Sequence, residues 1–483
     1  MTKRATGESL PNMILCMGDD HGWEETGYNG HPYLKTPTLD AMAQNGLRLN
    51  RFYAGHPSCS PTRGSVITGR HPNRYGTFAP GWSIRPEESS VAQLLGRAGY
   101  RCGHFGKWHL GPVKKTSPTN PGALGFDHWL SHDNFFELNP SLSENGRAHS
   151  VYEGESSEIL VKHALEFIQE SAKQKQPFFV VIWFGSPHEP YSGLTQDLSI
   201  YDELSERFKD RQVRLTSNKT GKPVKRPLGE VLRERYAEIT AMDRAMGDLR
   251  DGLDAQSVRE NTLLWYCGDN GTPPSGLFKS PLKGQKAQMY EGGLRVPGLI
   301  EWPAVISARS SEHVAVTSDI LPTLCTAAGI APSSRVLDGM DLNPVFRGES
   351  DKRSKPVCFW SFNTRGLPKD SRPWLSLEEQ QGTTPLVKLM NGKPTRKFQN
   401  FHYEEIREQD FLGPRAITTQ QYKLILDQSK TVTTELYDLM EDQGETTNIA
   451  SRKPGIVKEL SRQLRSWQES VLHSLTGSEY ERD

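Results

Sequence analysis

The sequence has no excess of charge of either sign and no long apolar run. Its 483 residues include 58 Lys plus Arg and 58 Asp plus Glu, so the formal net charge is zero. A chain without net charge has no general attraction to nucleic acid or to an anionic membrane, and no apolar run approaches the length of a membrane span. We therefore expect no nucleic-acid partner and no membrane partner, and any anion site must be a local concentration of cations.

Cysteine is scarce in this chain. The six cysteines are scattered, with no CxxC pair and no zinc-type spacing, so neither a zinc site nor an oxidising compartment is indicated. Cys16, Cys267 and Cys358 lie in apolar runs, and we expect them to be small buried hydrophobic residues. Cys59 differs from them, because it lies among Ser, Pro and Gly.

Several common motifs are also absent. The chain contains no P-loop, no GxGxxG that opens a helix and no GxSxG elbow. The N-terminal segment MTKRATGESLPN has Lys and Arg but lacks the apolar stretch that follows them in a secretory leader. We expect a cytoplasmic protein, or a periplasmic or extracellular one if a leader has been removed.

Alternating strand and helix patterns predict an α/β fold. Apolar runs bounded by turn residues predict buried strands at 13–18, 177–185 and 262–271, and helical spacing predicts amphipathic helices at 156–172 and 229–254. Such alternation is typical of a large mixed, mostly parallel sheet flanked by helices. The other predicted elements are helices at 38–46, 90–98 and 318–329 and strands at 101–106 and 299–303.

The texture of the sequence changes after about residue 350. The segments RAITTQQYKLILD and TELYDLM predict antiparallel strands joined through a turn, and a final helix is expected over 454–474. We therefore predict a larger α/β domain over 1–350, which carries the chemistry, and a smaller α+β domain over 351–483 with a short antiparallel sheet and the terminal helix.

Acidic and amide side chains follow two of the predicted strands. Asp19 and Asp20 follow the first strand, and Asp269 and Asn270 end another. Because α/β sheets bind ligands at the carboxyl ends of their strands, these oxygens suit a hard divalent cation such as calcium or magnesium. Either pair alone is equally consistent with a polar strand end or a helix cap, and the presence of two pairs favours a metal site.

The most specific local pattern is C-x-P-x-R-x-x-x-x-T-G-R, which begins at Cys59 and ends at Arg70. It resembles the first signature of the type I sulfatases, in the alkaline phosphatase superfamily, and the chain looks similar to arylsulfatase and N-acetylgalactosamine-6-sulfatase-like members. The resemblance runs from about Pro11 to the C-terminus and is densest before residue 300. The other matching segments are Gly106–Gly111, Ser186–Tyr191, Leu282–Lys286 and Glu291–Pro297.

The resemblance implies an alkaline phosphatase-like fold and a specific set of cofactors. In this family a separate formylglycine-generating enzyme oxidises the signature cysteine, here Cys59, to formylglycine, whose hydrate is the nucleophile. One calcium ion, with magnesium possible, is bound beside it. The metal ligands that the resemblance implies in this chain are Asp19, Asp20, Cys59, Asp269 and Asn270.

The resemblance also assigns roles to cations and histidines. Arg63, Lys107 and Lys286 supply the positive charge that a sulfate ester needs. His188 donates a proton to the departing alcohol, and His109 takes the proton from the second hydroxyl. Taken singly, a lysine between glycines is usually solvated and a histidine after proline is often a turn residue. Their joint occurrence in family order favours catalysis.

The sequence therefore predicts a sulfatase, a sulfuric ester hydrolase acting on sulfate monoesters. Phosphonate monoester and phosphodiester hydrolases of the same superfamily can share the CxPxR pattern, but the T-G-R extension and the GKWHLG segment favour a sulfatase. A catalytically silent glycan-binding homologue is the third possibility, and the absence of substitutions at the catalytic positions argues against it.

Two long polar loops outside the signatures suggest the class of substrate. Residues 112–150 and 364–412 are rich in His, Asn, Asp, Arg and Trp, a composition that suits a hydroxyl-rich sugar better than a flat aryl sulfate. We therefore expect a sulfated carbohydrate substrate. The polar residues of these loops include Asp133, Asn134, His402 and Arg407.

Overall fold

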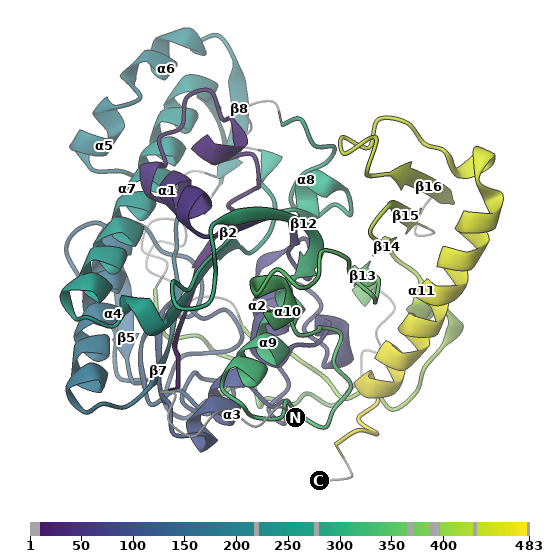
Figure 1. Cartoon of the computed structure of the whole chain (residues 1–483), viewed down its shortest axis with the longest axis horizontal. Coiled ribbons are helices and arrows are strands. Elements are labelled where there is room, and N and C mark those ends of the chain that lie inside the picture. Colours follow the sequence, from purple (N-terminus) through teal and green to yellow (C-terminus); the bar gives the residue numbers. More distant parts are fainter. Residues whose placement is uncertain are drawn as a thin grey trace.

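Ten strands form one large sheet at the centre of the molecule (Figure 1). A computed structural model of the chain describes residues 10–216, 222–274, 280–364, 371–385, 397–427 and 432–480, and Pro394. The strand order is β12-β2-β11-β10-β1-β7-β3-β4-β5-β6. The neighbouring strands β10, β1, β7, β3 and β4 are parallel, whereas β11 is antiparallel to both β10 and β2. The predicted mixed, mostly parallel sheet is confirmed.

The strands of this sheet are β1 (Asn12–Gly18), β2 (Leu47–Tyr53), β3 (Arg101–Lys107), β4 (His128–His132), β5 (Ser141–Glu144), β6 (Ser150–Val151), β7 (Phe178–Trp183), β10 (Thr262–Gly268), β11 (Gly298–Glu301) and β12 (Arg309–Val316). The helices that cover it are α1 (Pro37–Asn45), α2 (Cys59–Thr68), α3 (Val91–Arg97), α4 (Ser156–Lys173), α7 (Leu228–Ala255) and α9 (Ile320–Ala327). No helix among the described residues is both long enough and apolar enough to span a membrane.

Successive residues of β1 point to opposite faces of the sheet, and both sets are buried. Met13 and Leu15 join one core cluster with residues of α2, α3 and α9. Ile14 and Cys16 join the other cluster with residues of α1, α4 and α7. Because both faces of the strand are covered, its sequence must be apolar throughout, which explains the unbroken run that predicted it.

Helix α2 does not appear among the predicted elements. It contains Ser60, Pro61 and Gly64, and serine, glycine and proline are poorer helix formers than alanine or leucine. Every residue of α2 is buried in the core, so tertiary packing stabilises the helix despite its low intrinsic propensity. Strands β2 and β12 were also not expected, and they pair in parallel at one edge of the sheet.

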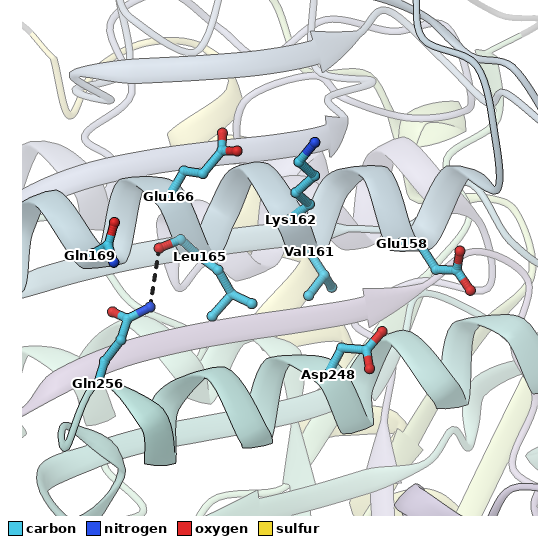
Figure 2. Close-up of a pocket in the computed structure, with 8 residues that line it drawn as sticks. All are labelled: Glu158, Val161, Lys162, Leu165, Glu166, Gln169, Asp248 and Gln256. Carbon is cyan, nitrogen blue, oxygen red and sulfur yellow. Dashed lines mark hydrogen bonds between the residues drawn. The ribbon is translucent and has the colours of Figure 1, made fainter.

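A groove with a volume of about 350 Å³ lies between α4 and α7 (Figure 2). At one end of this groove Gln256 Nε2 donates a hydrogen bond of 3.3 Å to the carbonyl of Leu165. The lining mixes acids, a lysine and two aliphatic residues, and none of these residues follows the carboxyl end of a strand. The residues that line it are Glu158, Val161, Lys162, Leu165, Glu166, Gln169, Asp248 and Gln256.

A second sheet of four antiparallel strands lies beside the large sheet, with helix α11 (Pro454–Leu475) packed on it (Figure 1). The predicted small antiparallel sheet and terminal helix are confirmed, although RAITTQQYKLILD forms a hairpin of two strands. Cys358 is half-buried, which corrects the expectation of a fully buried residue, because its strand pairs with only one neighbour in this sheet. The strands are β13 (Val357–Trp360), β14 (Arg415–Thr418), β15 (Tyr422–Asp427) and β16 (Thr433–Asp438).

The division of the chain near residue 350 into two domains stays a prediction. The change of sheet occurs between α10 (Asn343–Phe346) and β13. Within the described part of 364–412, the regular structure consists of the short 3-10 helix Glu408–Phe411 and isolated bridges. That segment therefore behaves as the long insertion that its composition indicates.

A buried ion cluster joins the small sheet to the rest of the molecule. Lys423 of β15 is fully buried, and its Nζ lies 3.0 Å from Glu291 Oε1 and 3.1 Å from Glu445 Oε1. Glu291 begins α8 (Glu291–Leu294), and its other oxygen accepts a hydrogen bond of 2.9 Å from Tyr53. Burial alone would lower the pKa of Lys423, but the two carboxylates hold it above its usual value.

We expect Lys423→Met to lower the free energy of unfolding by roughly 3–5 kcal/mol, because it leaves two buried carboxylates without their cation. Urea denaturation would measure this loss. The control is Lys458→Met on the exposed face of α11, which should change the stability by less than about 0.5 kcal/mol. Equal losses in the two variants would contradict the assignment.

Candidate functional site

The candidate site lies where β1, β10 and β3 end. Asp19 and Asp20 follow β1, Asp269 and Asn270 follow β10, and Lys107 is the last residue of β3. Strands β1 and β10 are parallel and in register up to their last residues. Acids separated by about half of the chain therefore meet at one edge of the sheet.

Oxygen atoms at this edge form a compact cluster. The backbone N–H of Asp20 donates a hydrogen bond of 2.9 Å to Asp269 Oδ1, and Asn270 Nδ2 donates one of 2.8 Å to Asp20 Oδ1. Asp19, Asp20, Cys59 and His188 place potential ligand atoms within 4.8 Å of one another. The structure thus brings His188 into a cluster for which the sequence predicted other ligands.

Two buried oxygens of the cluster fit a divalent cation. Asp19 Oδ1 and Asn270 Oδ1 accept no hydrogen bond from any residue that the structure describes. A buried carboxylate or amide oxygen without a donor is costly, and a hard cation with oxygen ligands would satisfy both atoms. The donor set therefore supports the predicted metal site on its chemistry.

Two cations from different elements balance the carboxylates. Arg63 of α2 is fully buried, with Nη2 2.7 Å from Asp269 Oδ2 and 3.6 Å from Asp19 Oδ1. Lys107 is also fully buried, and its Nζ lies 2.6 Å from Asp19 Oδ2. Arg63 Nη1 donates a further hydrogen bond of 3.1 Å to the carbonyl of Lys107, so the two cations are fixed relative to each other.

Lys286 and His188 lie on the other side of the carboxylates. Lys286 Nζ forms an ion pair with Asp20 Oδ1, and His188 Nε2 lies 3.7 Å from Asp20 Oδ2. The His188 imidazole stacks on Phe135, with the ring centroids 4.3 Å apart and the planes 13° from parallel. Phe135 follows β4 by three residues, and sequence reasoning assigned it no role.

Burial and charge shift the pKa values of these groups in different directions. Burial and the neighbouring Asp19 raise the pKa of Asp269 to about 6. Burial alone would raise the pKa of Asp20, but Lys286 and His188 hold it well below its usual value. Burial lowers the pKa of His188 to about 3. In this structure, Asp20 is ionised and His188 is neutral near pH 7.

Cys59 is the first residue of α2 and lies against the cluster. Its Sγ is 3.9 Å from Asp20 Oδ1, and only 2% of the residue is exposed. Burial raises the pKa of the thiol to about 12, although Lys107 and Lys286 act to lower it. The unmodified side chain is therefore a neutral thiol at pH 7, at a helix N-terminus whose backbone favours anions.

His109 lies two residues beyond the end of β3. It is buried, has a positive φ of 59°, and meets Phe398 edge-on at a centroid distance of 6.4 Å. Phe398 belongs to the polar insertion 364–412, so this insertion reaches the strand end that carries Lys107 and His109.

Arg235 of α7 is a buried residue that sequence reasoning missed. It pairs with Glu25 through bonds of 2.7 and 2.6 Å, and it donates hydrogen bonds of 2.6 Å to the carbonyls of Asp20 and Pro187. Arg235 thereby fixes the loop after β1 against the loop that carries His188. The available signal was a charged residue one position before Tyr236 on the apolar face of the helix.

Asp133 is a fastening residue in this structure. It is fully buried, and Oδ2 accepts hydrogen bonds from the backbone N–H groups of Thr383 and Thr384 at 2.5 and 2.8 Å. Oδ1 accepts one of 2.7 Å from the N–H of Val113. Its carboxylate holds segment 371–385 of the insertion against the end of β4.

The other loop and signature residues have separate surroundings. Asn134 is buried beside Phe135, and its Oδ1 accepts no hydrogen bond from the described chain. His402 stacks on Trp374, and Arg407 pairs with Glu405 on the surface. The last signature residue, Arg70, binds Glu88 and Glu479 rather than the strand-end cluster.

Comparison with known proteins agrees with this geometry. A family model described as Sulfatase matches residues 11–330. N-acetylgalactosamine-6-sulfatase of Mus musculus is 28% identical over 394 residues, which cover 73% of this chain and 69% of that protein. The ulvan-active sulfatase of Formosa agariphila is 28% identical over 422 residues, which cover 86% of this chain and 79% of that protein.

Solved structures show the same fold. The crystal structure of Ps i-CgsB has a TM-score of 0.75 at 21% identity and covers 96% of this chain and 93% of its own. The phosphonate monoester hydrolase of Agrobacterium radiobacter has a TM-score of 0.60 at 18% identity, with coverage of 95% and 96%. The fold alone therefore does not separate sulfate esters from phosphonate esters.

We expect Asp269→Ala to lose a divalent cation that the unmodified chain retains after purification, because the variant lacks one proposed oxygen ligand. Mass spectrometry of the metal content would measure the loss, and circular dichroism would confirm the fold. The control is Asp254→Ala, which removes an exposed carboxylate paired with Arg259 and should leave the metal content unchanged. Full metal occupancy in Asp269→Ala would exclude Asp269 as a ligand.

Proposed function

The chain belongs to the Sulfatase family, whose members are sulfuric ester hydrolases, and we propose that it removes sulfate from a carbohydrate through a formylglycine made from Cys59. The observation that carries the proposal is the position of Cys59 in the structure. It lies at a helix N-terminus, against a carboxylate cluster and beside the buried cations Lys107 and Lys286.

The cations match the charge of a sulfate ester. The ester carries negative charge on its oxygens, and the leaving oxygen gains charge as the S–O bond breaks, so fixed positive charge stabilises the transition state. Lys107 and Lys286 are the residues proposed to bind sulfate oxygens. Arg63, which two bonds to Asp269 fix in place, would orient the side chain at position 59.

The proposed metal is calcium, with magnesium as the alternative. Asp19, Asp20, Asp269 and Asn270 would hold it, together with the side chain at position 59. A bound divalent cation supplies Lewis acidity that polarises a sulfate oxygen and favours ionisation of the attacking hydroxyl. The support for this part of the proposal is the pair of buried oxygens that have no hydrogen-bond donor.

The proposed modification of Cys59 explains the need for a separate formylglycine-generating enzyme. A thiol whose pKa is about 12 is protonated at pH 7, and it has no second hydroxyl for the release step. The hydrate of a formylglycine supplies two hydroxyl groups on one carbon, of which one attacks sulfur and the other allows sulfate to leave. His109 is proposed to accept the proton of the second hydroxyl.

His188 is proposed to protonate the departing alcohol. Burial keeps its pKa near 3 in this structure, so the imidazole is neutral before substrate arrives. A sulfate ester brings negative charge beside the ring, and nearby negative charge raises the pKa of a histidine. Substrate binding would then be the event that allows His188 to carry the proton, while Phe135 holds the plane of the ring.

The carbohydrate part of the proposal rests on the insertion and on the relatives. Asp133 holds the insertion at Thr383 and Thr384, and Phe398 lies against His109, so a long polar segment borders the proposed sulfate site. Relatives of this chain are named for sulfated sugars or for ulvan. A polar wall supplies the hydrogen-bonding groups that a hydroxyl-rich substrate needs.

We expect sulfate release from a sulfated sugar to exceed turnover of matched phosphate and phosphonate esters by at least about 100-fold. The measurement compares kcat/KM for sulfated monosaccharides, 4-nitrophenyl sulfate, 4-nitrophenyl phosphate and phenyl phosphonate. A preference for a phosphorus ester would instead support the phosphonate hydrolase alternative. Fast turnover of aryl sulfate with no sulfated sugar cleaved would refute the carbohydrate assignment alone.

We expect Cys59→Ala to release no detectable sulfate, because it removes the proposed nucleophile. Cys325→Ala serves as the control, since Cys325 is equally buried but lies in α9. Mass spectrometry of the Cys59 peptide from an active preparation should show the aldehyde. Activity in Cys59→Ala, or an active preparation with only thiol at position 59, would exclude this mechanism.

We expect Phe135→Ala to reduce kcat by about tenfold for a sugar sulfate but by much less for 4-nitrophenyl sulfate. The phenolate leaves without full proton donation, whereas a sugar alkoxide requires it, so loosening His188 affects only the poorer leaving group. Phe135→Leu retains part of the packing and should fall between the two. Equal losses with both substrates would show that Phe135 has a purely structural role.

A further inference from the structure

A short two-stranded ribbon carries a concentration of positive charge. It consists of β8 (Gln212–Thr216, labelled in Figure 1) and β9 (Pro223–Pro227). Residues 211–226 contain six Lys and Arg and no acid, in a chain whose net charge is zero. This local excess matches the sequence-level requirement that anion binding depends on gathered cations.

The inward face of the ribbon is packed and neutralised. Leu215 is buried in a cluster with Tyr191 and with Val231 of α7. Arg226, which lies on the same face, has Nη2 2.7 Å from Glu234 Oε1 on α7. The cation that faces the protein is therefore paired with an acid of the protein.

The outward face carries two opposed cations. Arg214 and Lys225 are direct partners in the antiparallel ladder, and both are exposed. Neither forms an ion pair with any acid in the part of the chain that the structure describes, in contrast to Arg226. Like charges directly opposite each other destabilise a strand pair, and a two-stranded ribbon is only marginally stable. An anion from outside would relieve this repulsion.

The ribbon is attached to the loop of the proposed proton donor. Its Leu215 packs with Tyr191, whose Cα lies at most about 11 Å from that of His188, because consecutive Cα atoms are about 3.8 Å apart. Arg235 Nη1 donates hydrogen bonds to both the hydroxyl of Tyr191 and the carbonyl of Pro187. The outward cations therefore lie beside the candidate site, at a distance that a few sugar residues can span.

We propose that Arg214 and Lys225 form a subsite for a second sulfate or carboxylate of the same carbohydrate chain, a few sugar residues from the ester that is cleaved. The inference rests on the proposed function and narrows it to polyanionic oligosaccharides and polysaccharides. The guanidinium offers paired donors to two sulfate oxygens, and the ammonium adds a point charge. Because both groups are exposed, the contribution depends on salt concentration.

The test measures binding to the full chain with Cys59→Ala, which prevents turnover. Isothermal titration with a polysulfated galactan hexasaccharide compares two further double substitutions on this background. Arg214→Glu/Lys225→Glu reverses the ribbon charges, and Arg452→Glu/Lys458→Glu makes the same change of net charge at exposed positions near the start of α11. We expect the ribbon variant to bind about tenfold more weakly than the α11 variant, with the difference shrinking at high salt.

Further arms decide between explanations. A monosulfated disaccharide, too short to reach the ribbon, should lose less affinity than the hexasaccharide. Equal affinity of the two variants for the hexasaccharide would overturn the subsite, as would an equal loss for a DNA oligonucleotide of matched charge. If no variant binds a sulfated carbohydrate while unsubstituted enzyme still cleaves aryl sulfate, the substrate class itself fails. Arg214→Gln/Lys225→Gln provides a neutral pair if the reversed pair unfolds.

Discussion

The buried ion pair between Arg63 and Asp269 is the interaction on which the rest of the site depends. Both side chains are completely removed from solvent, and such a pair is stable only when each charge is satisfied on several sides. Arg63 also approaches Asp19 and binds the carbonyl of Lys107. Helix α2 is thereby locked onto the ends of β1, β10 and β3, with Cys59 at its first residue.

This charge balance prepares the site for an anionic substrate. Asp19, Asp20 and Asp269 face three cations, so the cluster gathers strong positive groups without a large excess of either sign. A divalent cation shared by the carboxylates would shift that balance toward positive charge and leave the lysines for sulfate oxygens. Positive groups already held in place need little reorganisation during reaction.

Outside this cluster, ion pairs serve mainly to hold segments together. Arg235 joins the loops after β1 and β7, and Lys423 joins the small sheet to α8. Asp133 fastens the polar insertion beside Phe135. The exposed cations Arg214 and Lys225 lack such partners, and this difference separates a binding surface from a structural contact.

Much of the fold could be predicted, because β1, β7 and β10 are buried on both faces and amphipathic helices such as α4 and α7 repeat every 3.6 residues. Helix α2 could not be predicted, since Pro61 and Gly64 oppose helix formation and only burial in the core overrides them. In the site, the reactive residue types could be named from their spacing. Phe135 and Arg235 could not, because their roles arise from contacts with residues about 50 to 215 positions away.

The sequence by itself determined which chemical groups are present and in what local order, since a thiol two positions before a proline and four before an arginine is a property of the chain alone. The tertiary structure decided what each group does. Arg63 and Arg70 belong to the same signature, yet one binds the carboxylates at the strand ends and the other binds Glu88 and Glu479. The physical reason is that pairing, burial and pKa depend on neighbours in space, and those neighbours come from distant parts of the chain.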